Sequence, residues 1–440
     1  MVNAWRKNKS NNSLSEVFSS INVPMNGNFY KKLFSFAGPG FIVAVGYMDP
    51  GNWATDIAGG AQFGYTLLSV ILISNLFAII LQHLALKLGV VAERDLAQAC
   101  RDHFHPTVNF ILWLFCEIAI AACDLAEVIG SAIALNLLFG IPLTWGIVIT
   151  ILDVFLILYL QHKNFRYIET FVAGLIFIII GCFIYEILIS KPDIFPILKG
   201  LIPKKEIITN PSMLYIAIGI LGATVMPHNL YLHSSIIQTR NYPRNNIGKK
   251  IAVKFGTIDS TLSLTLAFFV NAAILIVSAA TFHTSGNTNV ADIYDAHKLL
   301  TPLLGTSLAS IFFALALLAS GQNSTLTGTL AGQIVMEGFL NIKLKPWLRR
   351  LITRSIALVP ALVVVLIYGE KGTGKLLILS QVILSMQLSF AVVPLVMFTN
   401  SKAKMGEFAN KLWLQLLVWL ITFIIIFLNI YLLYNAFFGL

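Results

Sequence analysis

The chain has 440 residues, of which 57% are hydrophobic and only 11% are charged, and its mean hydropathy is +0.81. Soluble globular proteins carry about 25% charged residues, so this composition excludes a soluble enzyme and indicates a polytopic membrane protein. The net charge of +10 is explained below by membrane topology, and we expect no nucleic-acid partner. The four cysteines form no CxxC pair, which argues against a disulfide framework.

Apolar segments account for most of the chain after a polar and basic start. We expect residues 1–37 to form a cytoplasmic segment without a secretory signal. Apolar runs near the length of about 20 residues that a bilayer requires follow. They predict eleven spans, at 38–63, 66–88, 108–138, 143–161, 167–190, 212–238, 255–282, 303–338, 347–368, 375–398 and 411–437. The predicted fold is therefore an all-α polytopic membrane protein.

Prolines interrupt the first and the sixth of these spans. The first contains Asp49-Pro50-Gly51-Asn52, and the sixth contains Met226-Pro227-His228-Asn229. Proline removes a backbone donor and clashes with the preceding turn, so each helix is predicted to open there. Opened backbone cannot face lipid, so both breaks should line a polar cavity inside the protein. Such breaks in corresponding positions of two halves point to a transporter's substrate site, although Asp49 could serve only as a helix cap.

The positions of the two breaks also predict an inverted repeat. Five spans separate equivalent points of the two halves, and this odd number inverts the second half in the membrane. We expect the first repeat at 38–190, an extracellular connection at 191–211, and the second repeat at 212–398. A cytoplasmic loop and the eleventh span would then occupy 399–440, outside the repeat.

Lysine and arginine predict the orientation, because cytoplasmic segments are enriched in both. Most of the 30 basic residues fall on the same side as residues 1–37. The opposite side holds Lys191, Lys199, Lys204, Lys205, Lys298, Lys371 and Lys375. We therefore expect a multi-pass protein of the cell membrane with a cytoplasmic N-terminus and an extracellular C-terminus. The long outer connections 191–211 and 283–302 are the expected lids.

Residues at the two breaks offer a mixed set of metal ligands. Asp49 has a carboxylate, Asn52 an amide oxygen, Met226 a thioether, and Ala223 a backbone carbonyl that loses its helical donor. A carboxylate with carbonyls alone would suit Mg²⁺ or Ca²⁺, whereas a thioether favours first-row transition metals. A divalent transition metal therefore fits better than Na⁺, Mg²⁺ or an amino acid. An isolated methionine in a membrane is more often packing, so both interpretations of Met226 remain open.

A second set of polar side chains predicts a proton route. Intramembrane acids and histidines usually mark ion pathways and proton relays, and histidine titrates near working pH. The set comprises Glu117, Asp124 and Glu127 on the third span and His228 and His233 after the second break, with Arg349, Arg350 and Arg354 opening the ninth span. Each acid or histidine alone could simply make an interhelical hydrogen bond. The arginines could be topological anchors or ion-pair partners of the acids.

The motifs resemble those of a known transporter family. Met48-Asp49-Pro50-Gly51-Asn52 and Met226-Pro227-His228-Asn229 resemble the two signature breaks of the Nramp family of divalent metal transporters. The segments 321–333 and 336–339 resemble that family's transport signature. The resemblance implies a LeuT-type inverted repeat of five plus five helices, here with an eleventh helix. It also implies proton-coupled uptake of Mn²⁺ or Fe²⁺, and also of Co²⁺ and Cd²⁺, by alternating access.

The same resemblance assigns roles to individual positions. It implies metal ligation by Asp49, Asn52, Met226 and the Ala223 carbonyl, with Gln381 on the tenth span approaching the metal in some states. Proton movement would involve His228, His233, Asp124, Glu127, Arg349 and Arg350, to which residue type adds Glu117. The shorter bacterial members, whose usual substrate is manganese, also lack a twelfth span. We expect a functional monomer in the bilayer with no permanently bound cofactor.

Three other functions are weaker on the same residues. An amino-acid transporter binds the substrate carboxylate with bare backbone N–H groups, and Asp49 would repel that carboxylate. An intramembrane enzyme is disfavoured because the chain has no HExxH, no GxSxG and no paired Cys/His arrangement. A passive metal channel would need no proton route, so the acids and histidines argue against it.

Overall fold

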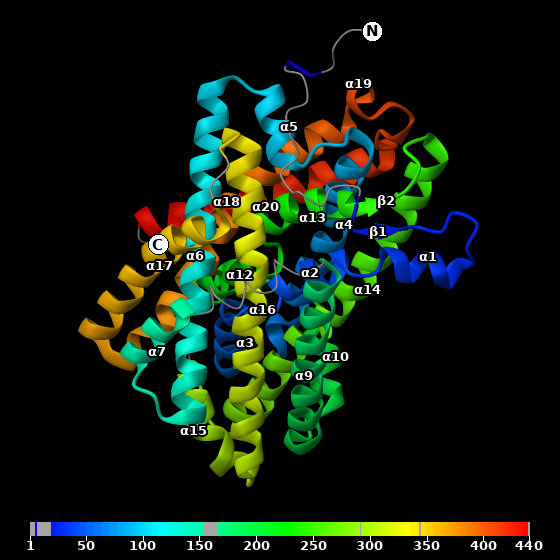
Figure 1. Ribbon diagram of the computed structural model, residues 1–440. Coiled ribbons are helices and arrows are strands. Elements are labelled where there is room, and N and C mark those ends of the chain that lie inside the picture. The colour runs from blue at the N-terminus through cyan, green and yellow to red at the C-terminus, as the bar shows by residue number, and fades with distance from the viewer. Residues whose placement is uncertain (1–4, 7–18, 153–164, 291, 343–344, 439–440) are drawn as a thin grey trace.

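The computed structural model describes residues 5–6, 19–152, 165–290, 292–342 and 345–438, and most of these residues are helical (Figure 1). Up to the second break, the elements are β1 (Ile21–Asn22), α1 (Phe29–Phe36), α2 (Pro39–Gly46), α3 (Pro50–Phe63), α4 (Leu68–Ala92), α5 (Leu96–His103), α6 (Pro106–Phe139), α7 (Leu143–Ile149), α9 (Phe165–Ser190), α10 (Ile194–Gly200), α11 (Glu206–Thr209) and α12 (Pro211–Thr224). After it come α13 (Pro227–Ile236), β2 (Arg240–Asn241), α14 (Asn246–Ser278), α15 (Ile293–Leu304), α16 (Ser307–Leu340), α17 (Pro346–Tyr368), α18 (Thr373–Asn400), α19 (Lys402–Met405) and α20 (Leu412–Phe438).

The long helices form one bundle with short elements at its two ends. We call the end that carries α5 and α19 the upper end and the end that carries α15 the lower end, as they are drawn in Figure 1. β1 and β2 pair in parallel, and this pairing attaches residues before α1 to the chain that follows α13. Short 3₁₀ segments join several helices, and α14 continues into a π-helical turn at Ala279–His283.

Eight helices in the described ranges are long and apolar enough to cross a membrane. The eleven predicted spans are compatible with this number. The first span is broken, and its second half continues into the second span as one helical stretch, Pro50–Ala92. The fourth and ninth spans are represented by shorter apolar helices, Leu143–Leu152 and Leu351–Ile367. The rest of the predicted span 143–161 lies outside the described residues.

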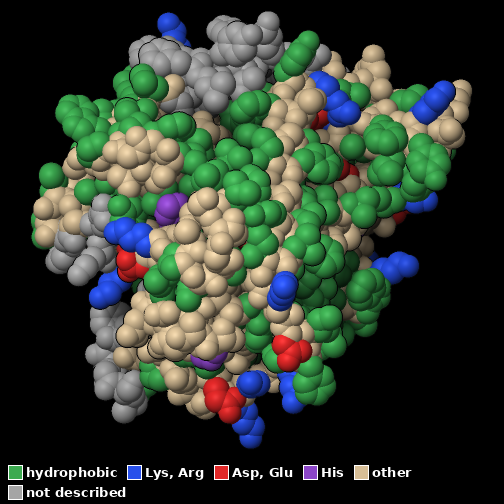
Figure 2. All heavy atoms as spheres, turned by 90° about the horizontal axis from the view of Figure 1, so that it is seen from below, with side chains coloured by type: hydrophobic (Ala, Val, Ile, Leu, Met, Phe, Trp, Pro, Cys, Tyr) green, Lys and Arg blue, Asp and Glu red, His purple; other side chains and the backbone are tan. Residues whose placement is uncertain are grey.

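The outer surface of the bundle is apolar where a bilayer would contact it. Large hydrophobic side chains are exposed on several long helices, for example Phe177 (62%), Leu366 (72%) and Phe423 (65%). Exposed apolar surface of this extent marks contact with a membrane or partner protein. Seen from below, hydrophobic and uncharged side chains cover most of the surface, and charged side chains lie mostly toward its edge (Figure 2).

Two predicted span starts differ from the structure. The seventh span was expected to begin at residue 255, but α14 begins at Asn246. The eighth span was expected to begin at residue 303, but residues 303–304 end α15, and α16 begins at Ser307. Gly305 adopts a left-handed conformation with φ of 71°, which terminates α15, and the Thr306 side chain accepts a hydrogen bond from the Leu308 amide and caps α16. The connection predicted at 283–302 therefore contains most of a helix, and the connection 191–211 contains α10 and α11.

Small residues bring the central helices together. α6 packs along α16, and a Cβ atom at Gly321 of α16 would lie 2.3 Å from Oγ of Ser131. On α6 itself, a Cβ atom at Gly130 would lie 2.2 Å from Cβ of Pro50, the first residue of α3. Close backbone approach at glycine is typical of helix packing in membranes. The contact between Gly130 and Pro50 places α6 directly against the first break.

Candidate metal site between two broken helices

The first break lies between α2 and α3, as predicted. Pro50 has no N–H to donate to the carbonyl of Gly46, so the helix cannot continue through this point. Asp49 caps α3, and its Oδ1 accepts a hydrogen bond from the amide of Asn52 at 2.8 Å. The helix-cap interpretation of Asp49 is therefore correct, but it accounts for only one carboxylate oxygen. Oδ2 is buried and has no hydrogen-bond partner.

The second break, between α12 and α13, repeats this chemistry. Val225 and Met226 separate the two helices, and Pro227 opens α13. Ala223 stands in the same relation to Pro227 as Gly46 does to Pro50, so its carbonyl loses the donor that a continuous helix would provide. The break is short because the amide of Val225 still bonds the carbonyl of Leu221 at 2.8 Å. Both predicted breaks are thus confirmed.

Neighbouring helices satisfy the backbone that the first break opens. Nδ2 of Asn271, on α14, donates to the carbonyl of Tyr47 at 2.8 Å. Oγ of Ser320, on α16, donates to the carbonyl of Met48 at 2.5 Å. These contacts show that the opened backbone is buried inside the protein and does not face lipid, where it would not be tolerated.

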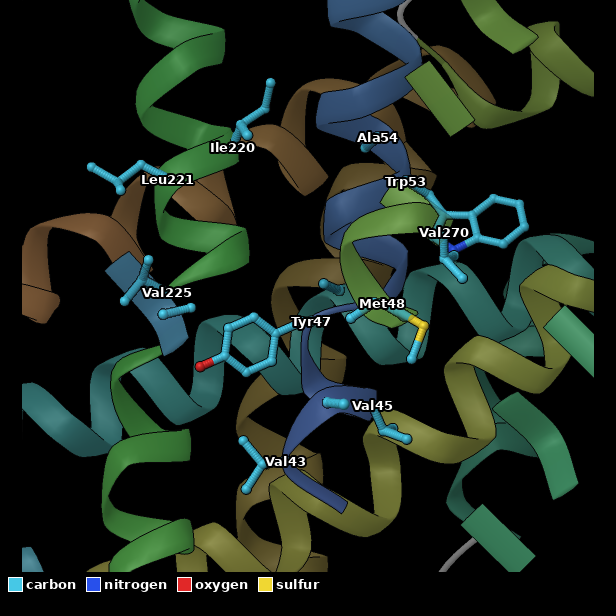
Figure 3. Close-up of a cluster of buried hydrophobic side chains, with 14 of the residues drawn as sticks. Val43, Val45, Tyr47, Met48, Trp53, Ala54, Ile220, Leu221, Val225 and Val270 are labelled. Atoms are coloured by element: carbon cyan, nitrogen blue, oxygen red, sulfur yellow. The ribbon is translucent and has the colours of Figure 1, made fainter. Parts of the chain in front are cut away.

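The two breaks lie side by side and share α18 as a neighbour. Val225 of the second break lies at the level of Tyr47 of the first (Figure 3). A Cβ atom at Gly46 would lie 2.2 Å from Nδ2 of Asn229, which directly follows the second break. Gln381 of α18 lies close to both broken helices, at Gly51 of α3 and at Gly222 of α12. A Cβ atom at Gly51 would lie 1.7 Å from the side-chain nitrogen of Gln381. A Cβ atom at Gly222 would lie 2.1 Å from the backbone carbonyl oxygen of Gln381.

Polar atoms without hydrogen bonds gather around these breaks. Oδ2 of Asp49, Oδ1 of Asn52, Oε1 of Gln381 and Oγ1 of Thr224 are all buried and have no hydrogen-bond partner. An unpaired buried polar group is unfavourable by about 1–3 kcal/mol, and a charged one by more. A cation, or water, would therefore be stabilised here. Among the described residues, no group of three or more His, Cys, Asp and Glu side chains could hold a metal, so any metal site must use other ligand types.

Met226 is fully buried and faces α6. It belongs to a cluster of buried apolar residues with Ala119, Cys123 and Leu384. This environment agrees with packing, and the position of Met226 at the second break keeps metal ligation as the alternative.

Cys123 joins the second break to the predicted acidic residues. Its Sγ lies 3.8 Å from Nε2 of His228 on α13 and 3.7 Å from Oε1 of Glu127, one turn along α6. The other carboxylate oxygen of Glu127 lies 3.3 Å from Nη1 of Arg354 on α17. A continuous set of buried polar groups therefore runs from α13 through α6 to α17.

His233 belongs to a separate set of contacts, on the other side of α13. Its Nδ1 lies 2.9 Å from Oε1 of Gln82 on α4. Nε2 of Gln82 donates to the hydroxyl of Tyr47 at 2.7 Å, and Tyr47 is part of the first break. The two histidines therefore contact different neighbours, and each connects to a different helix break.

The three acids of α6 also separate into two environments. A Cβ atom at Gly328 of α16 would lie 2.9 Å from Oε1 of Glu127 and 3.4 Å from Oδ1 of Asp124, so both carboxylates face α16. Glu117 instead accepts a hydrogen bond from Nε1 of Trp113 at 3.1 Å and lies 3.5 Å from Nη2 of Arg349. The side chain of Arg350 lies outside the described residues.

Sequence reasoning missed three members of these sets. Cys123 was considered only as one of four cysteines without a CxxC partner, and Gln82 and Tyr47 carried no signal beyond being polar or aromatic in an apolar run. Arg354 was recognised as a possible partner of the acids, but it was not placed in the proton route. Spacing along α6 puts Cys123 one turn before Glu127, which is the one pattern that could have suggested its role.

Comparison with known proteins decides the family. The model of the family described as natural resistance-associated macrophage protein-like, or Nramp, matches residues 40–435. The chain belongs to the Nramp family. A divalent metal cation transporter MntH of Listeria innocua is 64% identical over 431 residues, which cover 98% of this chain and 96% of the relative. Nramp proteins are transporters, so this Nramp chain is a membrane transporter and not an enzyme.

Solved structures confirm the predicted Nramp fold. A crystal structure of the manganese transporter of Eremococcus coleocola aligns with a TM-score of 0.90 at 43% identity, covering 98% of this chain and 92% of that one. Mhp1, a nucleobase-cation symporter, aligns with a TM-score of 0.59 at 15% identity over 91% of this chain and 90% of its own, which shows the fold alone. The LeuT-type architecture with broken first and sixth helices is therefore confirmed.

Proposed function

We propose that the chain carries divalent transition-metal ions across the cell membrane, with the metal bound between the two helix breaks. The ligands are Asp49, Asn52, Met226 and the carbonyl of Ala223. The observation that carries this proposal is the group of buried oxygens without hydrogen bonds, Oδ2 of Asp49 and Oδ1 of Asn52, beside two opened backbones. The names of the similar proteins, a divalent metal cation transporter in Listeria innocua and a manganese transporter in Eremococcus coleocola, support it.

The ligand chemistry favours a transition metal over an alkaline earth. Carboxylate and carbonyl oxygens suit any divalent cation, whereas the thioether of Met226 adds affinity only for softer ions. Mn²⁺ is the first candidate, and Fe²⁺, Co²⁺ and Cd²⁺ also fit this donor set. Because Mn²⁺ is the weakest binder of the first-row divalent series, the cellular availability of each metal contributes to what is carried.

Gln381 is proposed as a further ligand that reaches the metal in part of the transport cycle. Its side-chain oxygen is buried without a hydrogen-bond partner, while its nitrogen bonds Oγ of Ser380 at 3.0 Å. Since Gln381 contacts Gly51 of α3 and Gly222 of α12, it moves with respect to at least one of them whenever the breaks separate. It is therefore suited to sense metal between the two broken helices.

Proton coupling is proposed to use the polar contacts beside the site. Asp124, Glu127 and Glu117 provide the route along α6, next to His228 of α13, and Arg349 and Arg350 of α17 complete it. The contacts of Cys123 with His228 and Glu127 support this direction. His233 provides a second link, through Gln82 to the first break. Metal and proton would enter from one side and leave to the other by alternating access.

We propose the membrane orientation from the distribution of lysine and arginine, which are enriched in cytoplasmic segments. The upper end would face the cytoplasm, with the N-terminus inside and the C-terminus outside. The two repeats would occupy 38–190 and 212–398, preceded by the segment 1–37, joined by the extracellular connection 191–211 and followed by 399–440. One copy of the chain contains both breaks and all proposed ligands, so the functional unit is proposed to be a monomer without a permanently bound cofactor.

Uptake by the purified protein in liposomes tests this function. We expect uptake of Mn²⁺, Cd²⁺, Co²⁺ and Fe²⁺ that rises with an inward proton gradient, and little uptake of Ca²⁺ or Mg²⁺. Metal uptake that ignores the proton gradient would indicate a passive channel, and the absence of uptake for every transition metal would refute the proposal.

A further inference from the structure

An apolar groove lies on the side of the bundle. It has a volume of about 850 Å³ and is formed by α6, α18 and α20, which meet in the upper half of the molecule (Figure 1). Nearly all of its lining side chains are hydrophobic, and several remain exposed, including Ile118 (48%), Phe390 (42%) and Ile430 (61%). The groove therefore opens sideways, where the hydrocarbon of a bilayer would surround the bundle.

A basic cluster lies at the upper end of this groove. Phe104 lines the groove, and its ring lies 4.9 Å from the ring of the adjacent His103. Nζ of Lys404, on α19, lies 3.3 Å from Nδ1 of His103. Lys404 and Arg94 also both contact the ring of Trp5, at 4.1 and 4.8 Å from its centroid. Three side chains that can carry positive charge are thus gathered beside one end of an apolar groove, and one of them, Arg94, is paired with Asp102 at 2.8 Å.

The positive charges in this cluster interact unfavourably with one another. Burial and the nearby Arg94 lower the pKa of Lys404, and burial and Lys404 lower the pKa of His103. Two further lysines flank the cluster in sequence. Lys402 follows the end of α18, and Lys411 precedes α20. Both are exposed, and neither pairs with a carboxylate among the residues that the structure describes. An anion would therefore be attracted to this end of the groove.

We propose that the groove and the basic cluster together bind one anionic phospholipid. The acyl chain occupies the groove between α6, α18 and α20, and the phosphate lies against Lys404 and His103. An apolar groove that ends at clustered positive charge at the membrane surface matches the two parts of such a lipid, whereas a zwitterionic lipid gains less from the charges. The lipid would bridge α18, which carries Gln381, and α6, which carries Glu127. The site itself does not depend on the proposed transport function.

Lipid binding to the purified full chain tests this inference. Native mass spectrometry would be used to titrate the protein in detergent with phosphatidylglycerol and, separately, with phosphatidylcholine of the same acyl chains. We expect the anionic lipid to bind at least about fivefold more tightly, since one basic side chain near a charged surface contributes about that factor. Lys404→Gln should reduce phosphatidylglycerol binding by about fivefold and leave phosphatidylcholine binding unchanged.

Matched variants separate the headgroup from the chain. Ile430→Trp fills the groove and should weaken both lipids, whereas Leu416→Trp, equally exposed on α20 but outside the groove, should weaken neither. Lys375→Gln, at the lower end of α18, is the control for charge. The surface variant Lys402→Gln/Lys411→Gln should lower the preference for phosphatidylglycerol even if Lys404→Gln does not fold.

Three results would overturn the inference. Equal binding of the two lipids by the unmodified protein would show that the groove holds bilayer lipid without regard to charge. A preference for phosphatidylglycerol that survives in every lysine variant would place the headgroup elsewhere. Displacement of phosphatidylglycerol by millimolar inorganic phosphate, with no effect of Ile430→Trp, would assign the cluster to a free anion.

Discussion

Sγ of Cys123 lies 3.8 Å from Nε2 of His228, and the same sulfur lies 3.7 Å from Oε1 of Glu127. Cys123 also packs against Met226 in one buried cluster. A single side chain thus contacts a proposed metal ligand, a histidine of the second break and an acid of α6. This position would make Cys123 the most direct link between the proposed metal site and the proposed proton route.

Cys123→Val should uncouple the two activities. The substitution keeps the side chain small and apolar but removes the sulfur between His228 and Glu127. We expect Mn²⁺ affinity to change less than about twofold, because the ligands remain, while metal-driven acidification of a liposome lumen falls several-fold. Cys123→Ser, which keeps a polar atom, should retain more of the proton flux than Cys123→Val. Equal proton flux in both variants and in the unmodified protein would exclude a role for this residue.

Asp49 supplies the only charged ligand of the proposed site, and it also caps α3. Asp49→Ala removes both functions, and the lost cap alone should destabilise the protein by about 1 kcal/mol. Asp49→Asn keeps an oxygen that can accept from the Asn52 amide but removes the charge. We expect Mn²⁺ uptake to fall to background in both variants, because neutral ligands cannot replace attraction to a dication in a low-dielectric cavity. Near-normal uptake by Asp49→Asn would refute the assignment of Asp49 as a metal ligand.

Met226→Ala should change selectivity more than it changes rate. The gap left by the thioether admits water, a hard oxygen ligand that Ca²⁺ and Mg²⁺ prefer. We expect modestly weaker Mn²⁺ binding, clearly weaker Cd²⁺ binding, and competition or transport by the alkaline earths. The measurement is Mn²⁺ uptake against rising Ca²⁺ or Mg²⁺. If the variant and the unmodified protein exclude these ions equally, the packing interpretation of Met226 is correct.

Gly51→Ala tests the contact between α3 and α18. The added Cβ atom would lie 1.7 Å from Nε2 of Gln381, so the Gln381 side chain must move away from the first break. We expect transport to fall at least several-fold with the protein still folded, as judged by its elution profile and thermal unfolding. Gly174→Ala on α9 is the matched control, because no atom lies within 4 Å of its added Cβ. Equal uptake by the two variants would argue against a role for Gln381 in the site.

Glu127→Gln and His233→Ala address the two proposed proton links separately. Glu127→Gln removes the charge that faces Arg354, and His233→Ala removes the link through Gln82 to Tyr47. Both variants should reduce metal-driven acidification of liposomes more than they reduce metal affinity. Loss of a buried ion-pair partner can destabilise a protein by about 3–5 kcal/mol, so unfolding of Glu127→Gln must be measured alongside. Unchanged acidification in both variants would place the proton route elsewhere, for example through Asp49 itself.

Local chemistry determined the class of this protein and the place of its proposed site. Hydropathy alone identifies membrane helices, because a bilayer accepts little else, and proline opens a helix whatever surrounds it. The breaks at Pro50 and Pro227, and the ligand types beside them, could therefore be predicted from residues that are close in sequence. The start of α16 could not, since it depended on whether Gly305 would end a helix that the apolar pattern did not separate from the next span.

The contacts between helices were decided only by the tertiary structure. Cys123 and Gln82 gain their roles from side chains that are distant in sequence, His228 and His233, and a hydropathy pattern does not specify which faces of two apolar helices meet. The same reason explains why the sequence did not specify that Arg354 contacts Glu127 or that Arg349 lies beside Glu117. Along an apolar helix, the type of side chain predicts which interactions a residue can make. The packing of the helix bundle determines the partner with which it makes them.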